Sequence, residues 1–400
     1  KDKLVRLANL LELDRFAAIG DKKQLGAVDA GKPFDVMQQA GAETATMNLN
    51  IRARDKALRA AQYAAQGGKI DEALRHLGKD VVEVREGAAI EAAAAWLSLS
   101  PADRERTAIY ASGRSLRGQV NEAVQTGLKA NGEIGEPSLK LQVLARINTT
   151  QEELRHAGTY QMGMVVEVER DKRAQGISRG MYRVIGVDPR RERVELESER
   201  GKRFEFRPDR LRPQGEHDAL RLYELKDLAL HGGDRIRWTH TDHKRGLLNA
   251  DQARIMAVGR GGVRLVTSTG IEHHLSKDDP MLKRLDLAYA LNAHMAQGLT
   301  SDRGIAVMDS RERNLSNQQT FLVTITRLRD GLTLYVNNAS RLEAAVERNT
   351  GMKRSALETI GVLRDAAAAG QAKGQVQPPA PEKQPPEKDR SIVRPFEIGI

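Results

Sequence analysis

The sequence predicts an α/β protein that is interrupted by a β-rich insertion, and three observations lead to this prediction. Residues 1–157 alternate helical stretches with short apolar strands. Residues 158–286 alternate apolar and polar side chains with a period of two, and Gly-Gly and Asp-Pro pairs mark the turns. From residue 287 the chain returns to a helix and strands. The insertion is therefore expected to be a small barrel-like module within the α/β chain.

The expected elements before the insertion follow from hydrophobic periodicity and from helix stop signals. They are, in chain order, a helix, a strand at 15–20 and a second helix within residues 1–47, then a helical stretch at 55–77, a strand at 107–112 and a helix at 117–130 within residues 48–157. Because the chain begins with Lys1 inside a helical pattern, we expect it to be part of a longer protein.

The α/β part after the insertion, residues 287–340, contains two polar stretches next to apolar ones. Residues 291–307, "LNAHMAQGLTSDRGIAV", begin like an amphipathic helix and end like a buried strand. Residues 321–336 are expected to form a hairpin with its turn at Arg-Asp-Gly, so that Arg327 projects from the end of the first strand. Residues 341–400 should be a helical segment and a Pro-rich disordered tail.

The composition limits the classes of partner and of site. The chain has 400 residues, of which 40% are hydrophobic, enough for two or three domains with their own cores. Its net charge of +10 favours a polyanionic partner, with nucleic acid first and an acidic membrane surface second. The absence of cysteine excludes disulfides and thiolate zinc sites. The longest apolar runs are shorter than a membrane span, so no membrane insertion is expected.

Two early stretches place phosphate-compatible side chains at element ends. Gly20 and Asp21 follow an apolar strand, and the amide of Gln24 can donate and accept at once, which suits a γ-phosphate with its attacking water. A polar loop would explain them as well. Arg52 and Arg54 are expected to open a helix, where an arginine can offer a phosphate a planar fork of donors. The alternative is a solvated helix face.

Two stretches late in the chain can also be read either as a phosphate-binding site or as ordinary local structure. Tyr289, His294 and Gln297 share a helical spacing, and Gly298 is a natural helix cap. A capped helix and a turn explain Gly298, but they leave the density of polar residues around it unexplained. Arg327 is placed where an arginine finger would lie, or it is a surface residue of a hairpin.

The β-rich insertion contains one aromatic candidate and several histidines. Trp238 could stack on a base, although a place in the barrel core is the more common role of such a residue. No metal site is expected, because the histidines have no acidic partner at ligand spacing; they are His231, His240, His243, His273 and His274.

Four stretches, taken in order, resemble known helicase motifs. "GDKKQL", "IRARD", "AYALNAHMAQGLTSDRG" and "VTITRLRDGLTLY" resemble motifs III, IV, V and VI of superfamily 1, RecD-like branch, and the insertion resembles the SH3-like module of that branch. "GDKKQLGAVDAGKPFDVM" and "GDRIRWTHTDHKRGLLNAD" are most similar to the helicase half of the MobF-class relaxase–helicases of conjugative transfer. The resemblance covers about residues 15–340, and the pattern departs from it at Ala53 and Met295.

The resemblance implies a P-loop NTPase with RecA-like helicase domains. Residues 1–47 would end an incomplete first domain; residues 48–157 and 287–340 would form the second, and residues 158–286 the SH3-like insertion. It assigns ATP contacts to Gly20, Asp21, Gln24, Arg52, Gln297, Gly298 and Arg327, with Gln24 as γ-phosphate sensor and Arg327 as arginine finger. His294 and Thr300 would pass the nucleotide state to DNA, which Trp238 could also contact.

The function that the resemblance implies is ATP-driven DNA unwinding in the cytoplasm during conjugative plasmid transfer. Its cofactors would be ATP and Mg²⁺, and its partners single-stranded DNA, a relaxosome and a type IV secretion coupling protein. The 400 residues contain neither a Walker A pattern nor a Walker B strand, so we expect both upstream and no ATP hydrolysis by this chain alone. A RecD-like repair helicase and a non-hydrolysing single-stranded-DNA-binding or relaxosome scaffold module are the alternatives.

Overall fold

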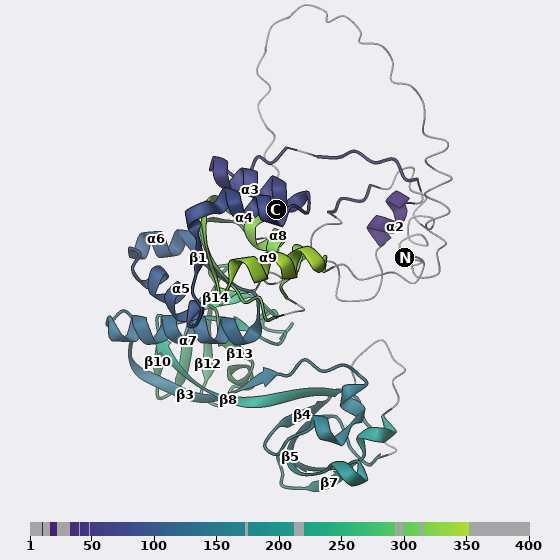
Figure 1. Ribbon diagram of the computed structural model, residues 1–400. Coiled ribbons are helices and arrows are strands. Elements are labelled where there is room, and N and C mark those ends of the chain that lie inside the picture. The colour runs from purple at the N-terminus through teal and green to yellow at the C-terminus, as the bar shows by residue number, and fades with distance from the viewer. Residues whose placement is uncertain are drawn as a thin grey trace, which may run out of the picture. The chain divides into compact units, whose positions relative to one another are not determined.

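A computed structural model describes Leu10 and residues 17–21, 33–39, 41–47, 49–172, 175–211, 220–292, 295, 299–312 and 315–351 (Figure 1). The chain divides into two compact units, of which the larger contains Lys23–Leu25 and Leu49–Met352. In the smaller unit, α2 spans Pro33–Gln39. Residues 17–21 lie outside helices and strands, so the strand expected at 15–20 is wrong for its described part. A strand needs a hydrogen-bonding neighbour, and no described segment pairs with these residues.

The α/β part of the larger unit is a five-stranded parallel sheet. Its order is β1 (Val81–Glu83), β16 (Leu328–Val336), β15 (Ser301–Met308), β2 (Thr107–Ala111) and β14 (Ala290–Leu291). The strands β2 and β15 are buried on both faces, as parallel strands covered by helices are. The strand predicted at 107–112 and the strand at the end of 291–307 are confirmed.

Helices cover both faces of this sheet (Figure 1). Those packed on one face are α3 (Lys56–Gln66), α4 (Ile70–Leu77), α8 (Gln318–Thr326) and α9 (Ala339–Arg348). Those on the other face are α5 (Ala88–Leu97) and α7 (Arg114–Ala130). Alternate residues of each strand serve the two cores: Ile305 and Val307 face α5 and α7, whereas Ala306 faces α3. The predicted helices at 55–77 and 117–130 are confirmed, the first as a pair.

The β-rich region consists of two antiparallel sheets rather than one barrel-like module. The six-stranded sheet contains β3 (Gly135–Arg146), β8 (Leu220–Gly232), β4 (Val165–Val168), β5 (Gly180–Asp188), β6 (Arg193–Ser198) and β7 (Arg203–Phe206), in that order. The five-stranded sheet contains β12 (Glu272–Ser276), β11 (Gly262–Thr267), β10 (Gln252–Gly259), β9 (Arg235–Trp238) and β13 (Leu285–Leu287). The β structure therefore begins at Gly135, before the expected boundary at residue 158.

The predicted hairpin at 321–336 is wrong, because its first half is the helix α8. Residues Thr320 to Ile325 of this helix are all buried. A helix buried on every side has no polar face, so its sequence lacks the helical period and can imitate a strand. The side chain of Asn317 caps the helix by accepting from Thr320 N at 2.8 Å. The Arg-Asp-Gly sequence continues β16 instead of turning.

The helix predicted at the start of 291–307 is not seen in its described residues. Ala290 and Leu291 pair with β2 as the short parallel strand β14. Tyr289 is buried, and its hydroxyl donates to Asp234 Oδ1 at 2.6 Å, so it belongs to the core rather than to a helix surface. The apolar side chains at the start of this stretch are buried because they belong to a strand of the sheet, and not because they line one face of a helix.

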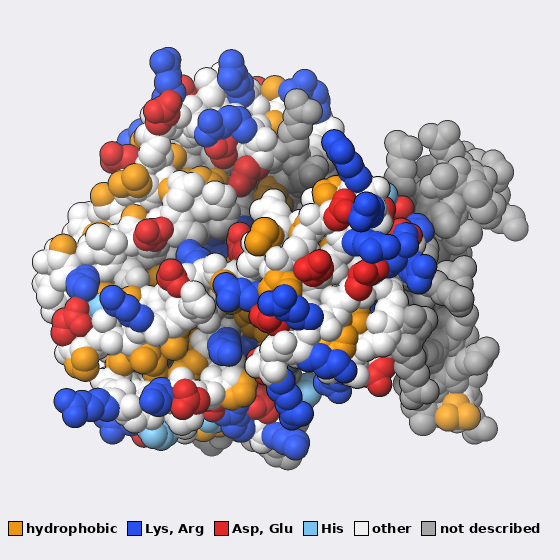
Figure 2. Space-filling view, turned by 90° about the horizontal axis from the view of Figure 1, so that it is seen from below, with side chains coloured by type: hydrophobic (Ala, Val, Ile, Leu, Met, Phe, Trp, Pro, Cys, Tyr) orange, Lys and Arg blue, Asp and Glu red, His pale blue; other side chains and the backbone are white. Residues whose placement is uncertain are grey.

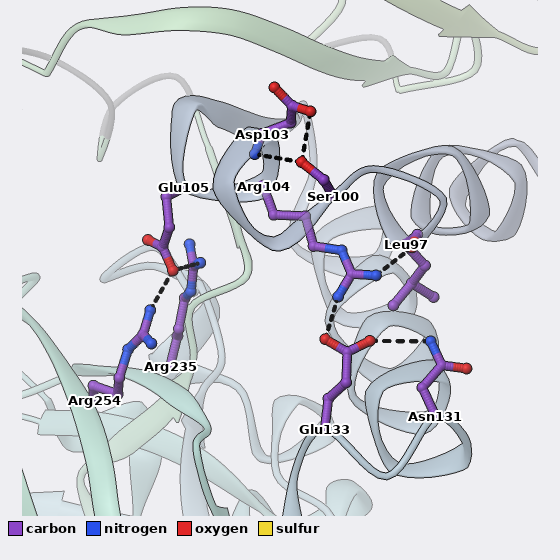
Figure 3. A network of polar contacts seen from close by, with 9 residues as sticks. All are labelled: Leu97, Ser100, Asp103, Arg104, Glu105, Asn131, Glu133, Arg235 and Arg254. Carbon is purple, nitrogen blue, oxygen red and sulfur yellow. Dashed lines mark hydrogen bonds and ion pairs between the residues drawn. The ribbon is translucent and has the colours of Figure 1, made fainter.

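The five-stranded sheet is joined to the α/β part through α6 (Pro101–Arg106) (Figure 3). Glu105 accepts from Arg235 of β9 at 2.8 Å and from Arg254 of β10 at 2.6 Å. Arg104 pairs with Glu133 at 2.5 Å after the end of α7. The guanidinium groups of Arg104 and Arg235 also lie over the ring of Trp96. None of the described helices combines the length and the apolarity needed to cross a membrane.

Candidate functional site

The site is built where three parallel strands begin. β2, β15 and β16 start at Thr107, Ser301 and Leu328, so the residues before them meet at one edge of the sheet. Arg327 lies there, between the last turn of α8 and β16, and is 3% exposed. Its Nε donates to Val323 O at 3.3 Å. Arg327 therefore ends a helix, and its predicted place at the end of a hairpin strand is wrong.

Arg52 reaches the same edge from the other end of the sequence. It is exposed, and its Nη1 donates to Thr326 O at 2.7 Å, beside Arg327. It does not open α3 as predicted, because that helix begins at Lys56 and is capped by Asp55, which accepts from Leu58 N at 2.7 Å. The fold thus brings together two of the arginines that the sequence assigned to a phosphate.

A buried amide fixes the turn that contains Arg327. Gln62 of α3 is 2% exposed, and its Nε2 donates to Ile325 O at 2.7 Å and to Leu328 O at 3.3 Å, on either side of Arg327. Its Oε1 accepts from Asn50 Nδ2. A buried amide left without partners is costly, so these contacts hold the helix end and the strand start in one geometry.

The same network extends to the segment that carries Arg52. Asn50 Oδ1 accepts from Arg52 N at 3.1 Å and from Ala53 N at 3.2 Å. Asn50 and Gln62 therefore link the two arginines through side-chain hydrogen bonds. The sequence analysis missed both residues; the available signal was a glutamine on the apolar face of an Ala-rich helix, where a polar residue needs a partner.

Ion pairs surround the two arginines. Arg54 makes a forked contact with Asp330 at 2.6 Å and reaches Asp302 at 3.0 Å. Asp302 also pairs with Arg106 at 2.9 Å and Arg329 at 3.6 Å. The hydrogen bond from Arg106, with the charges of Arg54 and Arg329, lowers the pKa of Asp302. Each of these exposed pairs contributes little to stability, because water and salt screen the charges.

The balance of charge at this edge is positive. In the described ion pairs, the three arginines Arg54, Arg106 and Arg329 share the two aspartates Asp302 and Asp330, and Arg52 lies close by. Burial raises the pKa of Tyr110, which lies within electrostatic reach of Arg327. The edge can therefore receive an anion with planar, forked donors, which suits a phosphate more closely than a neutral ligand.

The other predicted site residues are divided between several parts of the chain. Gly20 and Asp21 are exposed and belong to the smaller unit. Thr300 is exposed immediately before β15. The remaining ones lie outside the described residues: Gln24, His294, Gln297 and Gly298.

Trp238 is a core residue, so its predicted contact with DNA is wrong. It is 0% exposed and packs in the core beneath the five-stranded sheet. Ile236 lies two residues earlier on the same buried face of β9, and Leu285 of β13 lies directly opposite Trp238, so the ring is inaccessible to a base. His231 is also buried, with Nδ1 3.1 Å from Gly135 O. Within the described ranges, no group of three or more His, Asp or Glu side chains could hold a metal ion.

Positive side chains are spread over one face of the molecule. Figure 2 shows Lys and Arg side chains across the face seen from below, with Asp and Glu side chains between them. The chain as a whole has a net charge of +10. A long polyanion fits such a surface better than a small anion does.

Two family models match parts of the chain. The model described as the DNA relaxase TraI 2B/2B-like domain matches residues 143–230, which contain β4 to β7 and most of β8. Over these residues the chain is similar to the TraI relaxases of conjugative transfer. The resemblance seen in the sequence is thereby confirmed. A model described as an AAA domain matches residues 1–88 and agrees, with the parallel sheet, with the predicted P-loop NTPase class.

Two curated proteins are similar to most of this chain. The multifunctional conjugation protein TraI of Escherichia coli strain K12 is 21% identical in an alignment of 384 positions that covers 84% of this chain and 21% of that protein. A second Escherichia coli TraI is 23% identical over 385 residues with the same coverage. The chain therefore spans about a fifth of the length of these relaxase–helicases.

Among solved structures, Bacteroides Pif1 bound to ssDNA matches with a TM-score of 0.37 and 12% identity, over 81% of this chain and 56% of that one. The Pif1 helicase from Candida albicans matches with a TM-score of 0.36 and 11% identity, over 79% of this chain and 58% of that one.

Proposed function

We propose that the chain is part of an ATP-dependent DNA helicase that translocates on single-stranded DNA and unwinds duplex during conjugative plasmid transfer. The observation that supports this most directly is the meeting of Arg52 and Arg327 at the amino edge of the parallel sheet. Two arginines from distant parts of the sequence are a typical arrangement for receiving the terminal phosphate of a nucleotide. The charge balance at this edge agrees with that role.

The two guanidinium groups would act at different stages. Arg52 is exposed and donates to a neutral carbonyl, so it can exchange that partner for a phosphate oxygen. Arg327 is buried and would reach the phosphate only when the helix end rearranges as the two helicase domains close. A finger that is delivered by closure can contribute about 10³–10⁵ in rate.

The donors of this edge fit the phosphates of ATP, whereas the described residues offer no grouped carboxylates for Mg²⁺. When bound, Mg²⁺ would neutralise charge on the phosphates, and residues of the full-length protein would hold it. We assign γ-phosphate sensing to Gln24, with Gly20 and Asp21 shaping its loop. Gln297 and Gly298 would border the nucleotide, and His294 and Thr300 would contact the single strand.

The remaining parts of the proposal concern the insertion and the partners. The sheet of β3 to β8 would be the SH3-like module of a RecD-like helicase, and it would guide the single strand. A relaxosome and a type IV secretion coupling protein would be its partners in the cytoplasm. Support comes from the TraI 2B match and from the basic surface.

The experiment substitutes the two arginines in the full-length protein and measures DNA-stimulated ATP hydrolysis and binding to labelled single-stranded DNA. Arg52→Ala and Arg327→Ala should each reduce turnover about 10³-fold and leave DNA binding unchanged. Arg75→Ala is the control: Arg75 is an exposed arginine of α4 paired only with Asp71 among the described contacts, and it should leave both unchanged.

Unchanged turnover in both variants would remove the two arginines from the ATP site. DNA binding without ATP turnover in the unaltered protein would instead support the non-hydrolysing scaffold.

A further inference from the structure

A second cluster of arginines lies on the other face of the parallel sheet, around Asp286 of β13. Arg117 of α7 and Arg237 of β9 contact the same carboxylate oxygen of Asp286, at 3.1 and 2.9 Å. Their side chains are 7% and 11% exposed, whereas the carboxylate is 29% exposed. One carboxylate therefore neutralises two nearly buried cations and keeps an open side toward solvent.

A third arginine increases this excess of charge. Arg114 lies one helical turn before Arg117 on α7, is exposed, and donates to Asn148 Oδ1 at 2.8 Å. Neighbouring groups partly shield the Arg114 guanidinium from water, and this shielding, with the charges of Arg117 and Arg146, lowers its pKa against the opposing charges of Asp286 and Glu224. The arginines of the cluster thus outnumber these two carboxylates, and the excess of positive charge favours an anion.

Two buried donors in the cluster lack partners. The Nε atoms of Arg117 and Arg237 have no hydrogen-bond partner within the described part of the chain. Buried polar atoms are nearly always paired in folded proteins, so unpaired ones call for an explanation. A phosphate that replaced part of the Asp286 contact would let both guanidinium groups turn and use these donors.

The position of the cluster connects it with the proposed DNA contacts. Asn121 of α7 donates to Leu287 O at 3.0 Å and accepts from Ala290 N at 2.7 Å, which holds β13 and β14 against the helix. Met295, four residues after β14, brings its sulfur to 3.8 Å from Arg117 Nη1. The segment that contains His294 and Thr300 therefore starts beside the cluster.

We propose that Arg114, Arg117 and Arg237 bind a backbone phosphate of single-stranded DNA, with Asp286 as the internal counter-ion that a phosphate replaces. This inference rests on the proposed function, because it assumes that the chain binds single-stranded DNA. The shared chemistry would also suit a free phosphate. A polymer is favoured because the chain has a net charge of +10, which attracts a polyanion more strongly than a single phosphate.

The test measures binding of the whole chain to a fluorescein-labelled oligothymidine by anisotropy at several salt concentrations. Arg114→Gln should weaken binding several-fold and make the slope of log affinity against log salt shallower by about 0.7, the value for one lost phosphate contact on a single strand. Asp286→Asn should tighten binding several-fold, because it removes the competing negative charge and keeps the side-chain shape.

Arg75→Gln is the matched control, since it removes one exposed arginine from α4 on the opposite face of the sheet. It should bind as the unaltered chain does. Wild-type affinity and slope for Arg114→Gln would overturn the assignment even if Asp286→Asn failed to fold. A chain that binds no oligothymidine at all would overturn the proposed function, which separates the two failures.

A competition experiment distinguishes a phosphate of the DNA backbone from a free phosphate ion. Inorganic phosphate, added at constant ionic strength, should leave the bound oligothymidine in place. Displacement of the oligonucleotide at millimolar phosphate would show a site for free phosphate and overturn the DNA assignment.

Discussion

Replacing Gln62 by Leu tests whether a single buried amide holds the two arginines in place. The substitution keeps the size of the side chain and removes two donated hydrogen bonds and one accepted one. The carbonyls of Ile325 and Leu328 would then be buried without this partner. A buried polar group left unpaired costs about 1–3 kcal/mol.

The three contacts differ in weight. The bond to Ile325 O is short at 2.7 Å, the one to Leu328 O is long at 3.3 Å, and Asn50 lies near solvent. We therefore expect a total loss of about 2–4 kcal/mol of unfolding free energy. For a unit of this size the melting temperature should fall by about 3–6 °C.

Thermal unfolding followed by circular dichroism, with a urea titration beside it, measures this loss. Gln119→Leu is the control, because Gln119 is exposed on α7 and its one described bond, to Ser115 Oγ at 3.3 Å, faces solvent. It should change stability by less than about 0.5 kcal/mol. Equal losses in the two variants would refute the role given to Gln62.

Two further substitutions test the packing and the charge of the same unit. Gly304→Ala should destabilise by about 1–3 kcal/mol, because its Cβ would lie 2.6 Å from a methyl carbon of Leu328, which is 0% exposed. Gly331→Ala, in the neighbouring strand, has open space at its Cβ and should stay within about 0.5 kcal/mol in the same urea titration; a similar loss in both would contradict the packing argument. At Glu105, burial raises the pKa, but the hydrogen bond from Arg254 and the charges of Arg235 and Arg254 lower it by more than burial raises it. The net pKa of Glu105 therefore lies below its ordinary 4.5. A carboxyl whose pKa is lowered in the folded state stabilises the fold at a pH above its unfolded pKa, and this contribution is lost as the pH falls below about 4.5. Glu105→Gln should therefore flatten the acid side of the pH–stability curve by less than about 1 kcal/mol. An unchanged curve would count against the junction with Arg235 and Arg254.

The local elements of the α/β part were predictable because their patterns are local. The strand β2 and the helix α7 follow from an apolar run and from an amphipathic period that ends at Asn131 and Gly132. The alternation of β6, in which Val194 and Leu196 are buried, predicted an antiparallel strand correctly. Each of these elements buries one recognisable face, which is what periodicity reports.

The elements that failed are those buried on every side. α8 buries all residues from Thr320 to Ile325, and β14 is too short to show any period. For such segments the sequence records burial but not conformation. Trp238 failed for a different reason, because an aromatic residue on a strand serves a core and a base-stacking surface equally well until the facing sheet is known.

The candidate site was predictable as a set of residues but not as a geometry. Arg52 and Arg327 were identified from the order of short motifs. Gln62 was not, because its partners lie 263 and 266 residues away in the chain. A long-range hydrogen bond leaves no local pattern, so only the fold reveals which polar residue holds a site together.

One proposed anion site lies at the amino edge of the parallel sheet and the other lies beside α7, which covers one face of that sheet; the segment between β14 and β15 joins them. Its first end is held near the Asp286 cluster by Asn121, which bonds to Leu287 and Ala290. Its other end is Ser301, whose backbone N–H donates to Arg327 O at 3.0 Å. The segment is therefore held at one end near each site. A phosphate bound at one site would act on the end of the segment nearest to that site. The roles proposed for His294 and Thr300 require such an element, because coupling between nucleotide and DNA needs a segment that both sites can bias.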